Sequence, residues 1–143
     1  DPPYELLHRN LYSVHQRVAA TFSKGRVALA GDAAHVNNPL GGMGMNSGIH
    51  DGLNLAKKME EAWHGGDHAT LLARYDRQRR PMAEKYVQAQ SIANKRLLEE
   101  SDKEARETRL KELEFAATDE NAKRDYLMRA SLVQMVEEAN AIS

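Results

Sequence analysis

Apolar and polar residues follow two different patterns along the chain, and the pattern changes near residue 45. Before that point, residues 10–15 alternate between apolar and polar, whereas residues 26–30 form a short and mostly apolar run. Alternation with a period of two predicts a short strand, and the apolar run is compatible with a buried strand of a parallel sheet. The segment 23–25 predicts a turn before this run. A parallel strand needs neighbours that this chain does not supply, so we expect an incomplete sheet.

After residue 45 the apolar positions recur at helical spacing, which predicts a mostly helical chain. The first helix ends at Gly65 and Gly66, and one face of it carries Met45, Ile49, Leu53, Ala56 and Trp63. Asp67 is the expected N-cap of a second helix, which carries Leu71, Leu72 and Tyr75. Pro81 marks the start of a third helix, because proline is tolerated at a first helical position. That helix is expected to turn inward the residues Met82, Tyr86, Ala89, Ala93 and Leu97.

Two further helices are expected in the charged C-terminal stretch. Ser101 and Glu104 form a capping box for the fourth helix, and Thr118 with Asp119 caps the fifth. Both helices are rich in Lys, Arg and Glu, a composition typical of a solvated face. Binding of a partner is the alternative interpretation.

Composition narrows the class of protein without choosing a function. The chain of 143 residues has a formal net charge of −1 and no cysteine, so it shows no basic footprint for nucleic acid and has no disulfides or thiolate metal sites. No apolar run has the roughly 18–20 residues of a membrane span, and no signal peptide opens the sequence. We therefore expect a cytoplasmic protein. The opening Asp1-Pro2-Pro3-Tyr4, without an initiator Met, indicates the middle of a longer polypeptide.

The stretch that carries candidate chemistry is a strand, an acidic residue at its end, a glycine-rich loop and a helix start. Asp32 follows the apolar run, where ligands of α/β sheets bind, and its carboxylate suits ligand hydroxyls. An equally good interpretation is that Asp32 caps a local turn. The loop glycines Gly41, Gly42 and Gly44 allow close approach of backbone to a flat ligand. The helix start near Met45 and Asn46 offers free amide groups for an electron-rich oxygen or a phosphate.

Glycines also recur inside the first predicted helix. Gly44, Gly48 and Gly52, followed by Ala56, are each four residues apart. Each interior glycine costs about 1 kcal/mol relative to alanine. Such a stripe indicates that another backbone or a ligand presses against this face, or else a poor helix stabilised by its surroundings.

These segments together resemble the second FAD-binding motif of the class A flavoprotein monooxygenases, the family of 4-hydroxybenzoate and phenol-type hydroxylases. The resemblance is carried by residues 31–35, Pro39, residues 41–46, Asp51 and the pair Asn54-Leu55, and it extends to residues 75–81. It covers about residues 12–98. The last forty or so residues carry no motif.

The resemblance implies an FAD site whose residues are Gly31, Asp32, Pro39, Gly41, Gly42, Met43, Gly44, Met45, Asn46 and Arg17. Asp32 would hold a ribitol hydroxyl of FAD. The backbone from Gly42 to Asn46 would line the pyrimidine side of the flavin ring, with the helix dipole stabilising negative charge. Pro39 would place a carbonyl beside the ring and the substrate, and Arg17 would lie near the cofactor. His35 is interpreted as structural.

The family's reaction would use FAD, NAD(P)H as a transient reductant and a small aromatic substrate, which is hydroxylated through a flavin hydroperoxide. We expect a mostly α chain with two or three short strands, part of a glutathione-reductase-like α/β fold in the parent. Residues 1–45 would end the substrate domain and supply the last strand and loop of the FAD-binding domain. Residues 46–100 would supply the helix of that domain and the helices after it, and residues 101–143 charged helices.

The chain departs from the family's sequence pattern in one respect, which bears on what the chain can do without the rest of its parent protein. The N-terminal Gly-x-Gly-x-x-Gly fingerprint for the FAD pyrophosphate is not present. We therefore expect the isolated chain to be inactive. Two alternatives stay open: another flavoenzyme that shares the motif (a halogenase, epoxidase or reductase), or a helical, self-associating module that binds no flavin. The spacing of His64 and His68 suits a metal pair, but two glycines interrupt it, and no metal site is expected.

Overall fold

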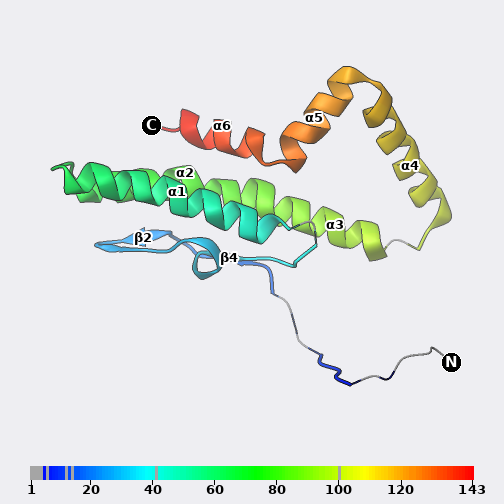
Figure 1. Ribbon diagram of the computed structural model, residues 1–143, viewed down its shortest axis with the longest axis horizontal. Helices are drawn as coiled ribbons and strands as arrows, with labels where there is room; N and C mark the ends of the chain where they lie inside the picture. The colour runs from blue at the N-terminus through cyan, green and yellow to red at the C-terminus, as the bar shows by residue number, and fades with distance from the viewer. Residues whose placement is uncertain (1–4, 6, 12, 14, 41, 100) are drawn as a thin grey trace.

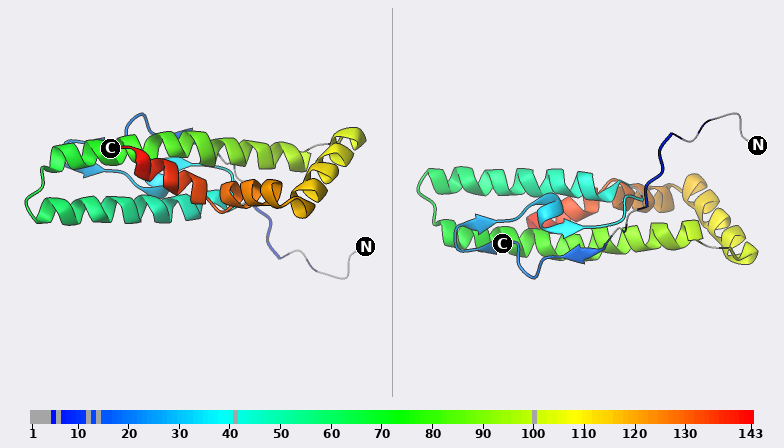
Figure 2. Two further views of the ribbon diagram at one scale, coloured as in Figure 1. Left: turned by 90° about the horizontal axis from the view of Figure 1, so that it is seen from above. Right: turned by 90° about the horizontal axis from the view of Figure 1, so that it is seen from below.

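The computed structural model describes residues 5, 7–11, 13, 15–40, 42–99 and 101–143. Two long helical rods lie side by side, with the short strands on one side of them and the C-terminal helices folded back over the other (Figures 1 and 2). In chain order the elements are β1 (Arg17–Val18), β2 (Ser23–Lys24), β3 (Val27–Ala28), the 3-10 turn η1 (Gly31–Ala33), β4 (His35–Val36), α1 (Met43–Trp63), α2 (His68–Met82), the π-helix η2 (Ala83–Gln88), α3 (Ala89–Glu99), α4 (Lys103–Thr118), α5 (Glu120–Ala130) and α6 (Val133–Ala141).

The strands form two antiparallel pairs. β2 and β3 make a hairpin around Gly25, whose φ of +61° is the turn conformation that favours glycine, and the predicted turn is confirmed. β1 pairs with β4. Within the described residues β3 pairs antiparallel with β2, because a tight turn returns residues 23–24 onto 27–28, and a place for this run in a parallel sheet of the parent stays a prediction. The strand predicted over residues 10–15 falls partly on residues 12 and 14, outside the described part, and its described positions are not in a strand.

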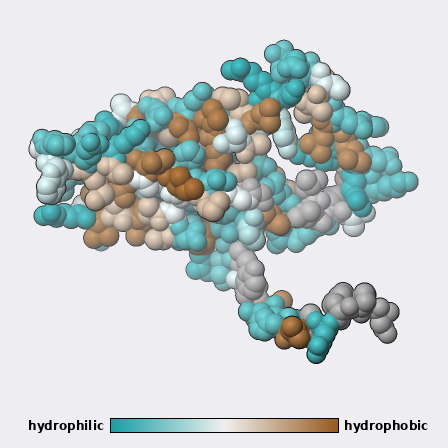
Figure 3. Space-filling view, viewed as in Figure 1, coloured by the Kyte–Doolittle hydropathy of each residue, from teal (hydrophilic) through white to brown (hydrophobic). Residues whose placement is uncertain are grey.

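The apolar residues that the sequence places on one face of the first helix lie on the exposed side of α1. Met45, Ile49, Leu53 and Trp63 are 73%, 54%, 58% and 88% exposed, and apolar surface gathers along this helix (Figure 3). The buried residues of α1 are Met43, Ser47, Asp51 and Lys58. Buried partners satisfy the polar groups of this face, so burying it costs less than its polarity suggests.

Helices α2 and α3 are one continuous rod joined by the π-helix η2, so Pro81 lies inside α2 and does not begin a separate helix. Asp67 caps α2 as predicted, since its carboxylate accepts a 2.9 Å hydrogen bond from the Thr70 amide. The wider turns of a π-helix shift the inward face along the rod. Met82 and Tyr86 are buried as predicted, whereas Ala89 and Ala93 are exposed and the Leu97 side chain lies outside the described part.

The C-terminal region contains one more helix than predicted. Asp102, one residue after the predicted Ser101, caps α4, and Asp119 caps α5 as predicted. The predicted fifth helix breaks at Leu132, which has a φ of +61°, and α6 follows. α4 and α5 bury no residue, in keeping with a solvated surface. α6 instead packs Met135 and Ala139 against Met82 and the rest of the larger core cluster. No described helix is long and apolar enough to span a membrane.

Candidate functional site

The predicted site is built where η1 and the loop after β4 meet the N-terminal half of α1. Gly31 has a φ of +57°, and a Cβ on Gly48 would lie 3.2 Å from the Gly31 Cα, so the two backbones are in direct contact. This contact explains one of the glycines of the predicted stripe by close approach within the chain itself. Gly52 has no atom within 4 Å of its would-be Cβ, so the stripe does not have a single cause.

A buried carboxylate fastens η1 to α1. Asp51 accepts hydrogen bonds from the Gly31 amide at 3.1 Å and from Arg79 Nε at 2.6 Å, and its other contact is His35 Nε2 at 2.8 Å. The side chains of Asp51, His35 and Arg79 are at most 2% exposed. Arg79 also donates to the Ser47 hydroxyl at 3.3 Å. Four elements far apart in the sequence therefore meet at one ionised group.

The charge state of Asp51 follows from these partners. Burial by itself raises the pKa of the Asp51 carboxyl, but the bond to His35 and the neighbouring Arg79 guanidinium outweigh it and leave the pKa below its ordinary value. Asp51 is therefore ionised at neutral pH and neutralises Arg79. The role of this network is to fix the strand-to-helix junction, and the interpretation of His35 as a structural residue agrees with its place in it.

The N-terminus of α1 has no side-chain cap and faces outward. Gly42 is the N-cap residue, with a φ of +65°, and within the described part of the chain no side-chain hydrogen bond caps this helix start. Asn46 donates its side-chain amide to the Gly42 carbonyl at 2.9 Å, which holds the end of the loop to the first turn. Uncapped amides at the start of a helix of 21 residues are a ready site for an electron-rich oxygen.

The structure places the predicted site residues that it describes on β1, on η1, in the loop after β4 and at the start of α1. Asp32 lies in η1 and is exposed, as are Pro39, Gly42, Met45 and Asn46. Arg17 is exposed on β1, paired with Val36, and so lies next to the same segment. Two predicted residues are limited in what they offer. Met43 buries its side chain in the core and can present only its backbone, and Gly41 lies outside the described residues.

These residues offer a set of polar groups to a ligand. An exposed carboxylate, glycine backbone and free helix amides are the donors and acceptors that a flat, hydroxyl-bearing and electron-rich ligand requires. A side chain at either glycine would disturb this segment: the φ of +65° at Gly42 disfavours other residues, and a Cβ on Gly44 would lie 2.7 Å from Asn37 Oδ1.

Some important residues were not predicted. The buried polar face of α1 and its partner Arg79 received no role from the sequence. The signal was present, because Ser47, Asp51 and Lys58 lie on the same helix face as the buried Met43. Lys58 is 4% exposed and donates to Asn54 and Gln78, both at 2.7 Å. Burial, and then the nearby Arg74, lower the pKa of Lys58 to about 8.

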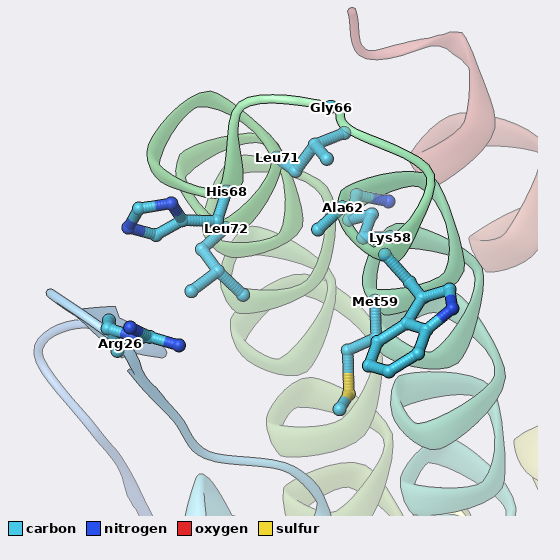
Figure 4. Close-up of a pocket in the computed structure, with 9 residues that line it drawn as sticks. Arg26, Lys58, Met59, Ala62, Gly66, His68, Leu71 and Leu72 are labelled. Atoms are coloured by element: carbon cyan, nitrogen blue, oxygen red, sulfur yellow. The ribbon is translucent and has the colours of Figure 1, made fainter.

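A cavity lies at the other end of α1 and is separate from the loop. It has a volume of about 360 Å³ and is bounded by the β2–β3 hairpin, the end of α1 and the start of α2. Arg26 reaches toward it from the hairpin, and Met59, Leu71 and Leu72 contribute apolar walls (Figure 4). None of the predicted flavin residues lines it.

Comparison with known proteins agrees with this geometry. A family model described as an FAD binding domain matches residues 1–90. The para-nitrophenol 4-monooxygenase of Pseudomonas sp. (strain WBC-3) is 37% identical over 125 residues, which are 87% of this chain and 31% of that protein. The 3-(3-hydroxy-phenyl)propionate/3-hydroxycinnamic acid hydroxylase of Mycolicibacterium smegmatis is 37% identical over 91 residues, 64% of this chain and 16% of that protein.

Solved structures give the same result. The p-nitrophenol 4-monooxygenase PnpA of Pseudomonas putida DLL-E4 superimposes with a TM-score of 0.77 and 34% identity, covering 87% of this chain and 32% of that one. The chain thus spans about a third of the two nitrophenol monooxygenases. Because the FAD binding domain model covers well over half of the chain and the relatives named above are monooxygenases or hydroxylases of aromatic compounds, the chain belongs to the FAD binding domain family of the FAD-dependent aromatic monooxygenases.

Proposed function

We propose that this chain supplies the ring-side wall of the FAD site in an NAD(P)H-dependent monooxygenase that hydroxylates a small aromatic substrate. The observation that carries the proposal is the exposed set formed by Asp32, the loop from Pro39 and the uncapped start of α1. The names of the relatives, which include nitrophenol and hydroxyphenylpropionate hydroxylases, support the aromatic substrate class. The cytoplasmic location and the three-part domain division expected from the sequence belong to the same proposal.

Each residue would act through a definite group. The Asp32 carboxylate would accept a hydrogen bond from a ribitol hydroxyl. The amides of Met43 to Asn46 and the helix dipole would stabilise negative charge on the pyrimidine ring, by about 0.3–2 kcal/mol. The Pro39 carbonyl already accepts the Gly42 amide at 3.2 Å and keeps a second lone pair for the ring or the substrate. Arg17 would lie beside the cofactor.

FAD itself, when bound, supplies the redox chemistry and the activation of oxygen. The chain's residues would orient the ring, stabilise the charge of the reduced state and exclude water from one face of it. The sequence contains no Gly-x-Gly-x-x-Gly motif to bind the pyrophosphate. We therefore propose that the chain alone does not catalyse the reaction.

A chimera tests the proposal. The chain replaces the matching segment of para-nitrophenol 4-monooxygenase, which supplies the rest of the cofactor and substrate sites. We expect a yellow protein with about one FAD per chain and NAD(P)H oxidation that depends on an aromatic substrate. The isolated chain is the control and should show neither. A folded chimera, with the helical circular dichroism of the parent enzyme but without flavin, would contradict the proposal.

A second candidate concerns the isolated chain, which we propose to be a helical module that associates with itself. The observation that favours it is the exposed apolar face of α1 formed by Met45, Ile49, Leu53, Met59 and Trp63. A contiguous apolar surface of this kind is typical of an interaction site. Light scattering over a range of protein concentrations tests this proposal, and a monodisperse monomer at every concentration would overturn it.

A further inference from the structure

The loop that precedes α1 is held from a helix more than fifty residues away in the sequence. Asn37 donates its side-chain amide to the Ser91 hydroxyl at 2.9 Å. The next residue, Asn38, donates to the Ser91 carbonyl, also at 2.9 Å. Farther along α3, Asn94 donates to the Leu40 carbonyl at 3.1 Å. Three hydrogen bonds, each from a side-chain amide, thus join residues 37, 38 and 40 of the loop to α3.

The same two asparagines also order the loop from within. Asn38 accepts a hydrogen bond from the Leu40 amide at 3.1 Å, and Asn37 donates to the Asn38 carbonyl at 2.7 Å. Asn37 further presses its Oδ1 against Gly44 in the first turn of α1. The Asn37 side chain therefore bridges α3 and the helix start that carries the free amides.

Two of the residues that form these hydrogen bonds are buried, which makes the loss of a partner costly. Ser91 is fully buried and Asn38 is 8% exposed, so each lost partner would leave a polar group without water to replace it. Such unsatisfied groups cost more than the net contribution of the hydrogen bond itself. The segment they hold includes Gly42 and Gly44, and glycine loses more conformational freedom on ordering than any other residue. A loop of this composition takes one conformation only when its surroundings impose it.

We infer that Asn37 and Ser91 are positioning residues for the flavin-facing loop, holding residues 39–40 and 42–46 in the geometry that presents the Pro39 carbonyl and the α1 amides. The link of this inference to flavin rests on the proposed function. The hydrogen bonds that join Asn37, Asn38 and Leu40 to Ser91 and Asn94, here called the clamp, do not depend on that proposal. α3 then supports the site by holding the loop in place, although none of its groups is proposed to contact the ligand. Preset donors and acceptors matter because a ligand-binding constellation must be held within about 0.5 Å of its working geometry.

Hydrogen exchange by NMR on the 143-residue chain tests the clamp without flavin. Asn37→Ala and Ser91→Ala should speed exchange of the Leu40 and Gly42 amides at least tenfold, while the Tyr75 amide in α2 changes less than twofold. Asn121→Ala, an exposed asparagine of α5, is the matched control and should change neither amide. Ser91→Thr retains the hydroxyl and should restore most of the protection.

Two outcomes would overturn the clamp: unchanged exchange at Leu40 and Gly42, or equal acceleration throughout the chain, which would mean a general loss of stability. If Ser91→Ala fails to fold, Asn94→Ala provides the test, because it removes the bond to the Leu40 carbonyl, along with a bond that Asn94 accepts from Gln90 within α3. The Leu40 amide should then exchange severalfold faster with no change at Tyr75, and unchanged exchange would again contradict the clamp.

The link to flavin has its own test in the chimera. Asn37→Ala should weaken FAD binding about tenfold and shift the flavin absorption maximum, without a change in helical content. A variant with wild-type affinity and spectrum would show that the clamp does not position the flavin loop. A wild-type chimera that binds no FAD would instead count against the proposed function and leave the hydrogen-exchange result as the measure of the clamp.

Discussion

The Asn37 side chain fills the space beside Gly44: the Asn37 Oδ1 atom lies 2.7 Å from the position that a Cβ on Gly44 would take. The contact joins the loop after β4 to the first turn of α1, and it is the reason that a helix position with ordinary φ is glycine. Through this contact, the conformation of the loop determines which residue types the helix can have at position 44.

The first prediction is that the effect of Gly44→Ala on the free energy of unfolding changes sign when Asn37 is replaced. Gly44→Ala should lower the free energy of unfolding of the wild-type chain, because the new methyl group displaces Asn37. In an Asn37→Ala background the same change should raise it by roughly 0.5–1 kcal/mol, the usual gain of alanine over glycine in a helix. Urea unfolding followed by circular dichroism measures both values.

Gly52→Ala is the control for this cycle. Nothing lies within 4 Å of a Cβ at Gly52, so the substitution should stabilise both backgrounds equally. If Gly44→Ala has the same effect with and without Asn37, the contact is not what keeps glycine at this position.

The second prediction concerns the buried pair of Asp51 and Arg79. Asp51→Asn keeps the shape of the side chain but removes the charge that neutralises a guanidinium only 2% exposed. Breaking a buried ion pair by removing one partner costs about 3–5 kcal/mol. Denaturant unfolding should show a loss of this size. Glu61→Gln, which breaks the exposed pair with Arg74, should cost no more than about 1 kcal/mol. Equal, small losses for both variants would contradict the account.

The third prediction is a rise of stability with pH that depends on Lys58. Its pKa is about 8 in the folded chain and about 10.4 in an unfolded one. Between these values the unfolded chain binds more protons, so the free energy of unfolding rises with pH. From pH 7 to 10 it should rise by up to about 2 kcal/mol relative to Lys58→Met. Urea unfolding of both proteins across this range gives the difference, and parallel curves would show that Lys58 is not the cause.

The sequence was sufficient to predict features that depend on local chemistry. Asp67 and Asp119 cap helices as predicted because an N-cap needs only its own carboxylate and an amide three residues ahead. The turn at Gly25 is local in the same sense. The family motif indicated a helix start near Met45, and α1 begins at Met43, whereas β4 lies within the segment that was expected to be a loop.

Features that depend on distant partners could not be predicted in this way. The inward face of α1 is polar because Arg79, twenty-eight residues after Asp51, neutralises it, and the sequence of α1 by itself does not identify this partner. Pro81 was expected to begin a helix, but the π-helix that follows it allows α2 and α3 to continue as one rod. The hold of Ser91 on Asn37 spans fifty-four residues.

The fourth prediction is that the exposed face of α1 drives association of the isolated chain. Leu53→Lys places a charge in the middle of this face, where the native leucine is 58% exposed, and it should lower the average mass in sedimentation or light scattering. Leu110→Lys changes an equally exposed leucine on α4 and should leave the mass unchanged. If both variants behave like the unmodified chain, association does not use α1.

The most direct test of the flavin wall is the dissociation constant of FAD in the chimera carrying Asp32→Ala. The exposed Asp32 carboxylate is proposed to accept a hydrogen bond from the ribitol chain, and such a charged bond contributes about 1.5–3 kcal/mol. The account predicts FAD binding weakened roughly 10- to 100-fold, measured by flavin fluorescence. Asp125→Ala, which removes an exposed carboxylate of α5, should leave it unchanged. An Asp32→Ala chimera that binds FAD as tightly as the unmodified one would contradict the assignment of this segment as a wall of the flavin site.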